Sequence, residues 1–215
     1  MTITGIQFKG DIIGDILSDP GLKSQVKDII KVEFEADKEI LLDKFDEHDV
    51  TQEINDPDSS NISGTLGGYG NLFGFLGFEE ETDPIKPVRN YLEKSIILKS
   101  IVFPEQKNQI RNSKGQFASG QRVNFAKINI NKPDLDDFDG VADLPWDSKN
   151  WVKGIERGVS GFQYFMSKHL TGRSNEGFQM RNPIQRAQNQ FKKVPYMTSL
   201  LNEFEKSFQK SLKTI

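Results

Sequence analysis

The stretch of sequence that decides the fold is Ser24–Ile54, SQVKDIIKVEFEADKEILLDKFDEHDVTQEI. Its apolar residues recur mostly at steps of three and four, which is the spacing of one helical face, and most other positions hold Lys, Asp or Glu. The residues at that spacing are Val26, Ile29, Ile30, Phe34, Leu41 and Phe45. The pattern predicts one long amphipathic helix with Ser24 as its N-cap, ending ahead of Pro57 because proline restricts the residue before it.

A helix of this kind cannot bury its apolar face alone, so other segments must supply a partner surface. A second long helix is predicted after Pro195, where apolar residues again repeat at helical spacing. They are Tyr196, Leu200, Leu201, Phe204, Phe208 and Leu212. Between the two helices, a shorter helix is predicted to open at Pro84 or Pro87. The β-branched residues of the latter half of 95–103 and of 122–130 favour strands.

These elements predict an α+β fold, in which a long N-terminal helix and a C-terminal helix pack on a small, mainly antiparallel sheet with extended loops. The chain has 215 residues, which is enough for one hydrophobic core. We therefore expect a single domain over residues 1–215, with loop extensions at about 55–90 and 104–150.

The amino-acid composition narrows the kinds of functional site and the cellular locations that we expect for the chain. The chain has no cysteine and only two histidines, which excludes disulfides and thiolate chemistry and leaves little material for a metal site. We expect no cofactor and no metal. No apolar run approaches the roughly 18 residues of a membrane span. Residues 1–15 lack a basic flank followed by an apolar stretch, which predicts no secretory signal and synthesis in the cytosol.

Charge is distributed unevenly along the chain, although the net charge is only −3. Residues 1–60 hold 15 Asp or Glu against 6 Lys or Arg, and residues 134–147 hold six Asp and no base. Residues 148–193 hold 9 Lys or Arg against 2 Glu. Two interpretations stay open: clusters of charge on solvated faces, or a basic surface that contacts an acidic neighbouring subunit or nucleic acid.

The glycine-rich stretch Asn61–Glu80, NISGTLGGYGNLFGFLGFEE, first suggests a phosphate-binding loop. A dinucleotide fingerprint would need glycine at Phe73, and a Walker loop would need a lysine that the stretch lacks. We instead expect a β-hairpin or wide loop that leads into a buried strand. Its candidate core or subunit-interface residues are Gly70, Phe73, Gly74, Phe75 and Phe78.

Other motifs for chemistry fail on spacing. In DLDDFDGVAD (134–143) a calcium loop would need glycine at its sixth position after an acidic first one, and a glutamate at its twelfth. Counting from Asp134 puts Gly140 at the seventh position, and counting from Leu135 leaves the first position without an acid. The segment is therefore interpreted as a solvated acidic loop. Gly158–Gly161 lacks one spacer residue of a nucleophile elbow. No catalytic site is predicted, and the chain is not expected to be an enzyme.

The basic part of the chain raises the question of DNA. Lys149, Lys153 and Arg157 are spaced four apart, so they would share one face of a helix, and aromatic residues lie between the cations. Non-specific contact with the backbone of duplex DNA is the chemistry that such a face offers. The candidate DNA-facing residues are Lys149, Lys153, Arg157, Arg173, Arg181 and Arg186.

Several segments together resemble the head–tail joining or tail-completion (neck) structural proteins of long-tailed phages. These are FDEHDVTQEI (45–54), SSNISGTLGGYGNLFGFLGF (59–78), DPIKPVRNYL (83–92), SKGQFASG (113–120), NWVKGIERGVSGFQYFM (150–166), TGRSNEGFQMRNPI (171–184) and VPYMTSLLNEFEKSF (194–208). In that family a long N-terminal helix packs on a small sheet. A strand-like stretch of the form W/Y-x-x-x-I/V-E-x-G is matched here by Trp151, Ile155, Glu156 and Gly158, and Pro195 precedes the closing helix.

The resemblance implies a structural role without enzymatic activity. Copies of the chain would form a ring between portal and tail, where DNA passes, in a virion assembled in the host cytoplasm. The partners implied are further copies, other neck, portal and tail proteins, and packaged duplex DNA, with Trp151 and Glu156 as added interface or core candidates. The glycine stretch replaces the family's usual segment after the first helix, which leaves the tail-completion ring, a neighbouring neck ring, a tail terminator and a minor tail protein open. The alternative from another class is a DNA-binding packaging accessory that uses residues 149–193.

Overall fold

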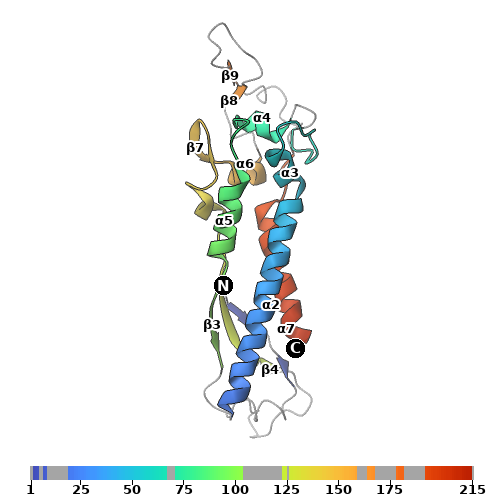
Figure 1. Cartoon of the computed structure of the whole chain (residues 1–215), viewed down its shortest axis with the longest axis vertical. Coiled ribbons are helices and arrows are strands. Elements are labelled where there is room, and N and C mark those ends of the chain that lie inside the picture. The colour runs from blue at the N-terminus through green and yellow to red at the C-terminus, as the bar shows by residue number, and fades with distance from the viewer. Residues whose placement is uncertain are drawn as a thin grey trace. The chain divides into compact units, whose positions relative to one another are not determined.

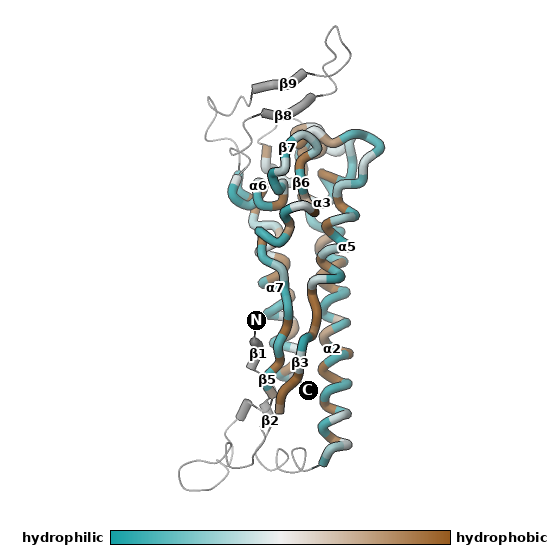
Figure 2. The backbone as a smooth tube through the Cα atoms, turned by 90° about the vertical axis from the view of Figure 1, so that its left-hand side faces the viewer, coloured by the Kyte–Doolittle hydropathy of each residue, from teal (hydrophilic) through white to brown (hydrophobic). Residues whose placement is uncertain are grey.

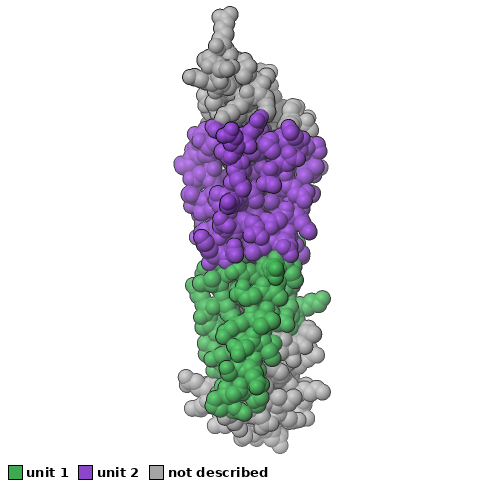
Figure 3. Space-filling model, viewed as in Figure 1, with its two compact units in different colours: residues 1–40, 95–132, 203–215 green, residues 41–94, 133–202 purple. Residues whose placement is uncertain are grey.

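The computed structural model describes residues 2–4, 7–8, 19–66, 71–103, 123–124, 126–158, 164–167, 178–181 and 192–214. Figure 1 shows the order of the elements. Contacts divide the chain into two compact units, coloured in Figure 3. Unit 1 comprises residues 1–40, 95–132 and 203–215, and unit 2 comprises 41–94 and 133–202. The single domain with loop extensions stays a prediction.

The long N-terminal helix is present as α2, Pro20–Glu47. It begins four residues before the predicted Ser24, because the Asp19 carboxylate accepts a hydrogen bond from the Gly21 N–H at 2.7 Å and serves as the cap. At its other end the helix stops at His48, whose extended backbone separates it from α3, Asp49–Asn55. His48 Nδ1 accepts a hydrogen bond from the Val50 N–H at 3.2 Å and so starts the second helix. The single helix that the sequence predicts over Ser24–Ile54 is therefore two helices, α2 and α3.

Unit 1 contains a small sheet together with part of each long helix, α2 as far as Ile40 and the last helix from Glu203. Its three-stranded antiparallel sheet has the order β1 (Thr2–Thr4), β5 (Lys127–Asn131), β3 (Ile97–Val102). A two-stranded ladder pairs β2 (Gln7–Phe8) with β4 (Val123–Asn124). Residues 203–214 come from α7, Met197–Thr214. The predicted α+β class, with both terminal helices and a small antiparallel sheet, is confirmed.

Aromatic packing joins α2 to α7 inside unit 1. Phe34 of α2 is buried and meets Phe208 edge-on, with ring centroids 5.5 Å apart, and Phe204 at 5.9 Å. Buried Asp37 accepts a hydrogen bond from the Ser207 hydroxyl at 2.5 Å, and its Oδ2 has no hydrogen-bond partner. A carboxylate in this position ties the pair of helices to one register, because sliding either helix would break its bond.

Unit 2 is built from short elements. These are α3, α4 (Leu72–Leu76), α5 (Ile85–Ser95, in unit 2 as far as Lys94), the 3-10 helix η2 (Leu135–Phe138), β6 (Asp143–Leu144), β7 (Asp147–Asn150), α6 (Trp151–Arg157), β8 (Tyr164–Ser167) and β9 (Phe178–Arg181). β6 pairs with β7 and β8 with β9, both antiparallel. Tyr196 stacks between Phe45 and Trp151, with centroid distances of 5.9 and 6.5 Å, at the centre of this unit.

Three expectations about these elements are wrong. The buried strand predicted to follow the hairpin or wide loop of the glycine stretch is helix α4 over Leu72–Leu76, because Asn71 provides a helix cap there. The stretch that the phage resemblance gives as strand-like, beginning at Trp151, is helix α6. Ile29, expected in the buried stripe of α2, is 43% exposed. Within the described part of the chain, no helix is both long and apolar enough to cross a membrane.

Replacing Phe34 with alanine tests the packing of α2 on α7. The ring is almost fully buried and contacts two other rings, so its loss should reduce the free energy of unfolding by about 3–5 kcal/mol. Urea unfolding followed by circular dichroism measures this. Glu35→Ala, at an exposed position one residue away, is the matched control and should stay within about 0.5 kcal/mol of wild type. Equal effects of both changes would contradict the packing.

Candidate functional site

The glycine-rich stretch is an ordered part of unit 2 where the structure describes it. Asn71 Oδ1 accepts a hydrogen bond from the Gly74 N–H at 2.8 Å and caps α4, and Gly77 ends the helix with φ of 78°. That left-handed conformation favours glycine. Three predicted core or interface residues of this stretch, Phe73, Phe75 and Phe78, are buried within the chain itself. Gly70 lies outside the described residues.

A buried carboxylate that the sequence did not reveal holds this stretch in place. Glu53 of α3 is fully buried, and its two oxygens accept hydrogen bonds from the Ser63 N–H at 2.9 Å and the Leu72 N–H at 2.8 Å. The Asn71 amide adds bonds to the carbonyls of Pro57 at 2.5 Å and Ser59 at 3.1 Å. Charge-assisted bonds from a carboxylate to backbone N–H groups are among the stronger ones in proteins. The described residues of this segment, 53–66 and 71–74, are therefore held by polar bonds rather than by strand pairing.

The aromatic candidate Trp151 belongs to the core of unit 2. It is buried, stacks on Tyr196 and meets Phe78 edge-on at 6.3 Å. The Tyr196 hydroxyl lies 2.6 Å from Thr51 Oγ1, and burial raises the pKa of Tyr196 well above its ordinary value. A phenol that stays protonated in a closed core is suited to packing, not to proton transfer with a substrate.

Glu156, the other candidate taken from the phage resemblance, caps the beginning of α7. Its carboxylate accepts hydrogen bonds from the Thr198 N–H at 2.5 Å and from the Thr198 hydroxyl at 2.6 Å. The first turn of a helix has N–H groups without partners inside the helix, and a negative charge there is favourable. Glu156 thus connects α6 to the start of α7 within unit 2.

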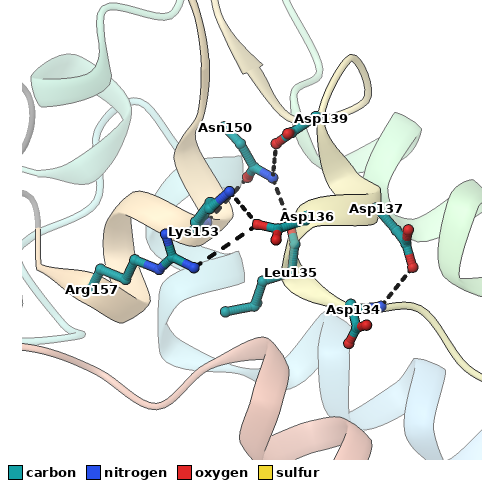
Figure 4. A network of polar contacts seen from close by, with 8 residues as sticks. All are labelled: Asp134, Leu135, Asp136, Asp137, Asp139, Asn150, Lys153 and Arg157. Carbon is teal, nitrogen blue, oxygen red and sulfur yellow. Dashed lines mark hydrogen bonds and ion pairs between the residues drawn. The ribbon is translucent and has the colours of Figure 1, made fainter.

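Figure 4 shows a polar cluster in which the acidic segment around η2 meets α6. Asn150 is 6% exposed, and its amide donates to the Leu135 carbonyl at 2.9 Å and to Asp139 Oδ1 at 3.0 Å. Its Oδ1 accepts from the Lys153 N–H at 3.1 Å and caps α6. One asparagine therefore joins the end of β7, the start of α6 and the turn of η2.

The three predicted DNA-facing residues that the structure describes with side chains lie together here, and each one has an acidic partner. Lys153 forms an ion pair with Asp136, and Arg157 Nη2 lies 3.9 Å from the same carboxylate. Lys149 Nζ lies 2.9 Å from an oxygen of Asp147. The hydrogen bond from Lys153 lowers the pKa of Asp136, and the positive charge of Arg157 adds a smaller effect in the same direction.

An open hollow of about 390 Å³ adjoins this cluster. It is lined by Asp139, Ser148, Lys149, Asn150, Lys153, Gly154, Arg157 and Gly158. Ser148 is the one hydroxyl among these residues, and no histidine lies with it. No group of three metal-ligating residues occurs in the part of the chain that the structure describes. The hollow presents charged side chains, the Asn150 amide and the Ser148 hydroxyl.

The cluster also changes the interpretation of the uneven charge. Two of the six aspartates of 134–147, Asp136 and Asp147, contact the three cations Lys149, Lys153 and Arg157 and offset their charge. This surface therefore does not have the excess of positive charge that attracts duplex DNA. Arg173 and Arg186 lie outside the described residues, and Arg181 is placed only as the partner of Tyr164 in the β8–β9 ladder. A DNA-facing role for all six residues stays a prediction.

Comparison with known proteins gives no further assignment. No family model, no curated protein and no solved structure matches this chain.

Replacing Glu53 with glutamine tests whether the buried carboxylate fixes the glycine stretch. Glutamine keeps one acceptor oxygen but turns an NH₂ group toward the second N–H, so the free energy of unfolding should fall by about 1–3 kcal/mol. Urea unfolding measures the change. Glu47→Gln, at an exposed position, should change it by less than about 0.5 kcal/mol. A variant as stable as wild type would show that the two bonds contribute nothing net.

The titration of Asp136 tests the polar cluster. The lowered pKa means that its ion pairs are present above the ordinary value of 3.8 and are lost only as the pH falls through the lower folded value. Carboxyl-carbon NMR should show Asp136 titrating below 3.8 in the wild type. Lys153→Met should move the pKa upward towards 3.8, and Arg157→Met should move it less. The reverse order would contradict the contacts in Figure 4.

Proposed function

We propose that this chain is a structural protein of a tailed-phage virion, in the neck, where a ring of copies joins the head and its portal to the tail around the DNA passage. It would assemble in the host cytoplasm and require no cofactor. The tail-completion or connector ring is the position we favour. A tail terminator or minor tail protein would be a different position within the same particle.

The observation that supports the proposal most is the exposure of large apolar side chains on unit 1. Ile29, Val32 and Ile40 of α2 and Ile97 and Val102 of β3 are 43–67% exposed. The chain is otherwise polar, with hydrophobic residues making up 35% of it. Gathered apolar exposure of this kind is typical of surfaces that another protein covers. A ring subunit needs such surfaces on every copy.

The polar contacts of unit 2 also support a structural role. Glu53, Glu156 and Asn150 each bind backbone N–H groups, and Trp151 packs in a core. The residues that carry the phage resemblance at Trp151–Gly158 therefore hold the fold together. The packaging-accessory alternative gains no support from the cluster around α6, because its cations are paired with aspartates.

Deleting the gene in the phage or prophage that carries it tests the proposal. We expect electron microscopy of the lysate to show DNA-filled heads and separate tails, because the joining ring would be missing. Expression of the chain from a plasmid should restore complete particles, and an antibody should detect it in purified virions. Complete, infectious particles without the chain would overturn the proposal. Empty heads with no packaged DNA would favour the packaging-accessory function instead.

A further inference from the structure

Helix α2 carries a second apolar stripe on its outer face within unit 1. Ile29, Val32, Ala36 and Ile40 follow one another at steps of three and four, and all four are exposed. At 3.6 residues per turn, this outer stripe lies roughly 120° around the helix from the buried stripe of Val26, Ile30 and Phe34. Figure 2 shows the alternation of apolar and polar positions along α2.

Carboxylates border this outer stripe. Asp28, Glu35 and Glu39 are exposed on the side of the helix next to Val32. By the same helical geometry, the lysines of this part of α2 lie on the far side, beyond the acidic border. They are Lys23, Lys27, Lys31 and Lys38. Lys31 lies 3.1 Å from Asp28 and is paired with it, so the negative margin of the stripe comes mainly from Glu35 and Glu39.

The outer face of the sheet in unit 1 has the complementary character. Directly paired residues of an antiparallel ladder share a face, so Ile97 lies with Asn131, and Val102 lies with Lys127. Lys127 is exposed, whereas its neighbours on the opposite face, Ile128 and Ile130, are buried. Lys99 is exposed as well, at the register shift of β3. No acidic side chain occurs on this face among the described residues of β3 and β5.

This face departs from the usual pattern of a half-buried antiparallel sheet, in which the solvent side is polar. Ile97 is 45% and Val102 is 49% exposed. In Figure 2 the strand β3 is hydrophobic towards both of its ends and polar between them. The sheet thus presents two apolar side chains with lysines beside them.

We propose that the outer stripe of α2 in one copy of the chain docks on the outer face of β3 and β5 in a second copy. Ile29, Val32 and Ile40 would pack against Ile97 and Val102, while Glu35 and Glu39 face Lys99 and Lys127. The inference deepens the proposed function by naming its self-association surface, and to that extent it rests on it.

Charge distinguishes the pairing of the two unlike surfaces from the two pairings of like surfaces. Two α2 stripes brought face to face would place carboxylate margins against each other, and two sheet faces would place lysines against lysines. Only the pairing of unlike surfaces brings opposite charges together around an apolar centre. Exposed pairs of this kind contribute mainly specificity, and the burial of apolar area contributes most of the affinity.

The two surfaces also match in length. From Ile29 to Ile40 the helix rises about 16 Å, and from Ile97 to Val102 the strand extends about 16 Å. Helix-on-sheet packing is a common way to bury both elements. Because the two surfaces differ, the contact is heterologous and leaves one of each surface open at the ends of any short oligomer. Such a contact closes into a ring or continues as a filament.

Two substitutions test the contact on the full-length chain. Val32→Lys places a cation opposite Lys99 and Lys127, and Val102→Lys places one in the apolar centre of the other surface. Sedimentation velocity over a concentration series should show wild-type oligomers and at least a tenfold weaker self-association for each variant. Ile62→Lys, at a 43% exposed isoleucine of unit 2, is the matched control and should associate like wild type. Circular dichroism verifies that each variant is folded, and Ile29→Lys and Ile97→Lys serve as second variants.

Mixing the two variants gives the sharper result. Val32→Lys retains an intact sheet face and Val102→Lys retains an intact α2 stripe, so one good contact remains between them. The mixture should form 1:1 dimers of twice the chain mass that grow no further. A wild type that is monomeric at every concentration from about 1 to about 100 µM would overturn the inference, because that range includes the dissociation constants of weak specific interfaces. Single variants that associate like Ile62→Lys, or a mixture that stays monomeric, would also overturn it.

These outcomes are separable from those of the proposed function. A monomeric wild type whose gene deletion still separates heads from tails removes the docking surface and leaves the neck function standing. If the oligomers depend on Val32 and Val102 but the phage assembles normally without the gene, the docking surface is supported and the neck function is excluded.

Discussion

The constraint on which the rest of the structure depends is that α2 cannot bury its apolar residues by itself. A helix of 28 residues with Val26, Ile30 and Phe34 on one face needs a partner along that face. In unit 1 the partner is α7, through Phe204 and Phe208. The fold class follows from this need, because a helix pair on a small sheet buries the stripe with few residues.

The second theme is the use of acidic side chains as structural bonds. Glu53 holds two backbone N–H groups in the interior, and Glu156 holds the first turn of α7. Asp136 neutralises Lys153, and Asp37 binds Ser207 between two helices. Where the carboxylate is buried, as at Glu53, its removal leaves a backbone donor without a partner. A chain whose acids hold its elements together has fewer of them available for chemistry at a substrate.

The sequence predicted the elements whose signal is periodic. The six apolar residues identified by spacing are all buried, five of them in α7 and Tyr196 directly before it, and β3 and β5 lie where β-branched residues gather. The sequence-based prediction failed where a single capping side chain determines where a helix begins or ends. His48 divides the long helix by accepting the Val50 N–H, and Asn71 starts a helix where glycines suggested a hairpin. Neither capping interaction produces a periodic pattern, and the glycines of 61–80 fit turns and short helices equally well.

The candidate site was the least predictable part for a related reason. Glu53 looks like Glu33 or Glu35 in the sequence, since all three are acidic residues on a helix, yet Glu53 is fully buried and the others are not. What distinguishes it is the position of two N–H groups, at Ser63 and Leu72, that only the folded chain brings near. The cations of α6 show the same effect, because sequence spacing placed them on one face without revealing that aspartates of 134–147 would cover it.

In helix α2 the same three- and four-residue spacing of apolar residues arises from two separate stripes. Steps of three and four identify a helix whichever stripe they follow, and in this helix they follow two stripes. Ile29 was assigned to the buried stripe because it fits the spacing, but it belongs with Val32 and Ile40 on the exposed side. By contrast, the apolar residues of α7 are concentrated on one face. A helix with one partner needs one stripe, so the second stripe of α2 is the feature on which the proposed contact with a second copy of the chain rests.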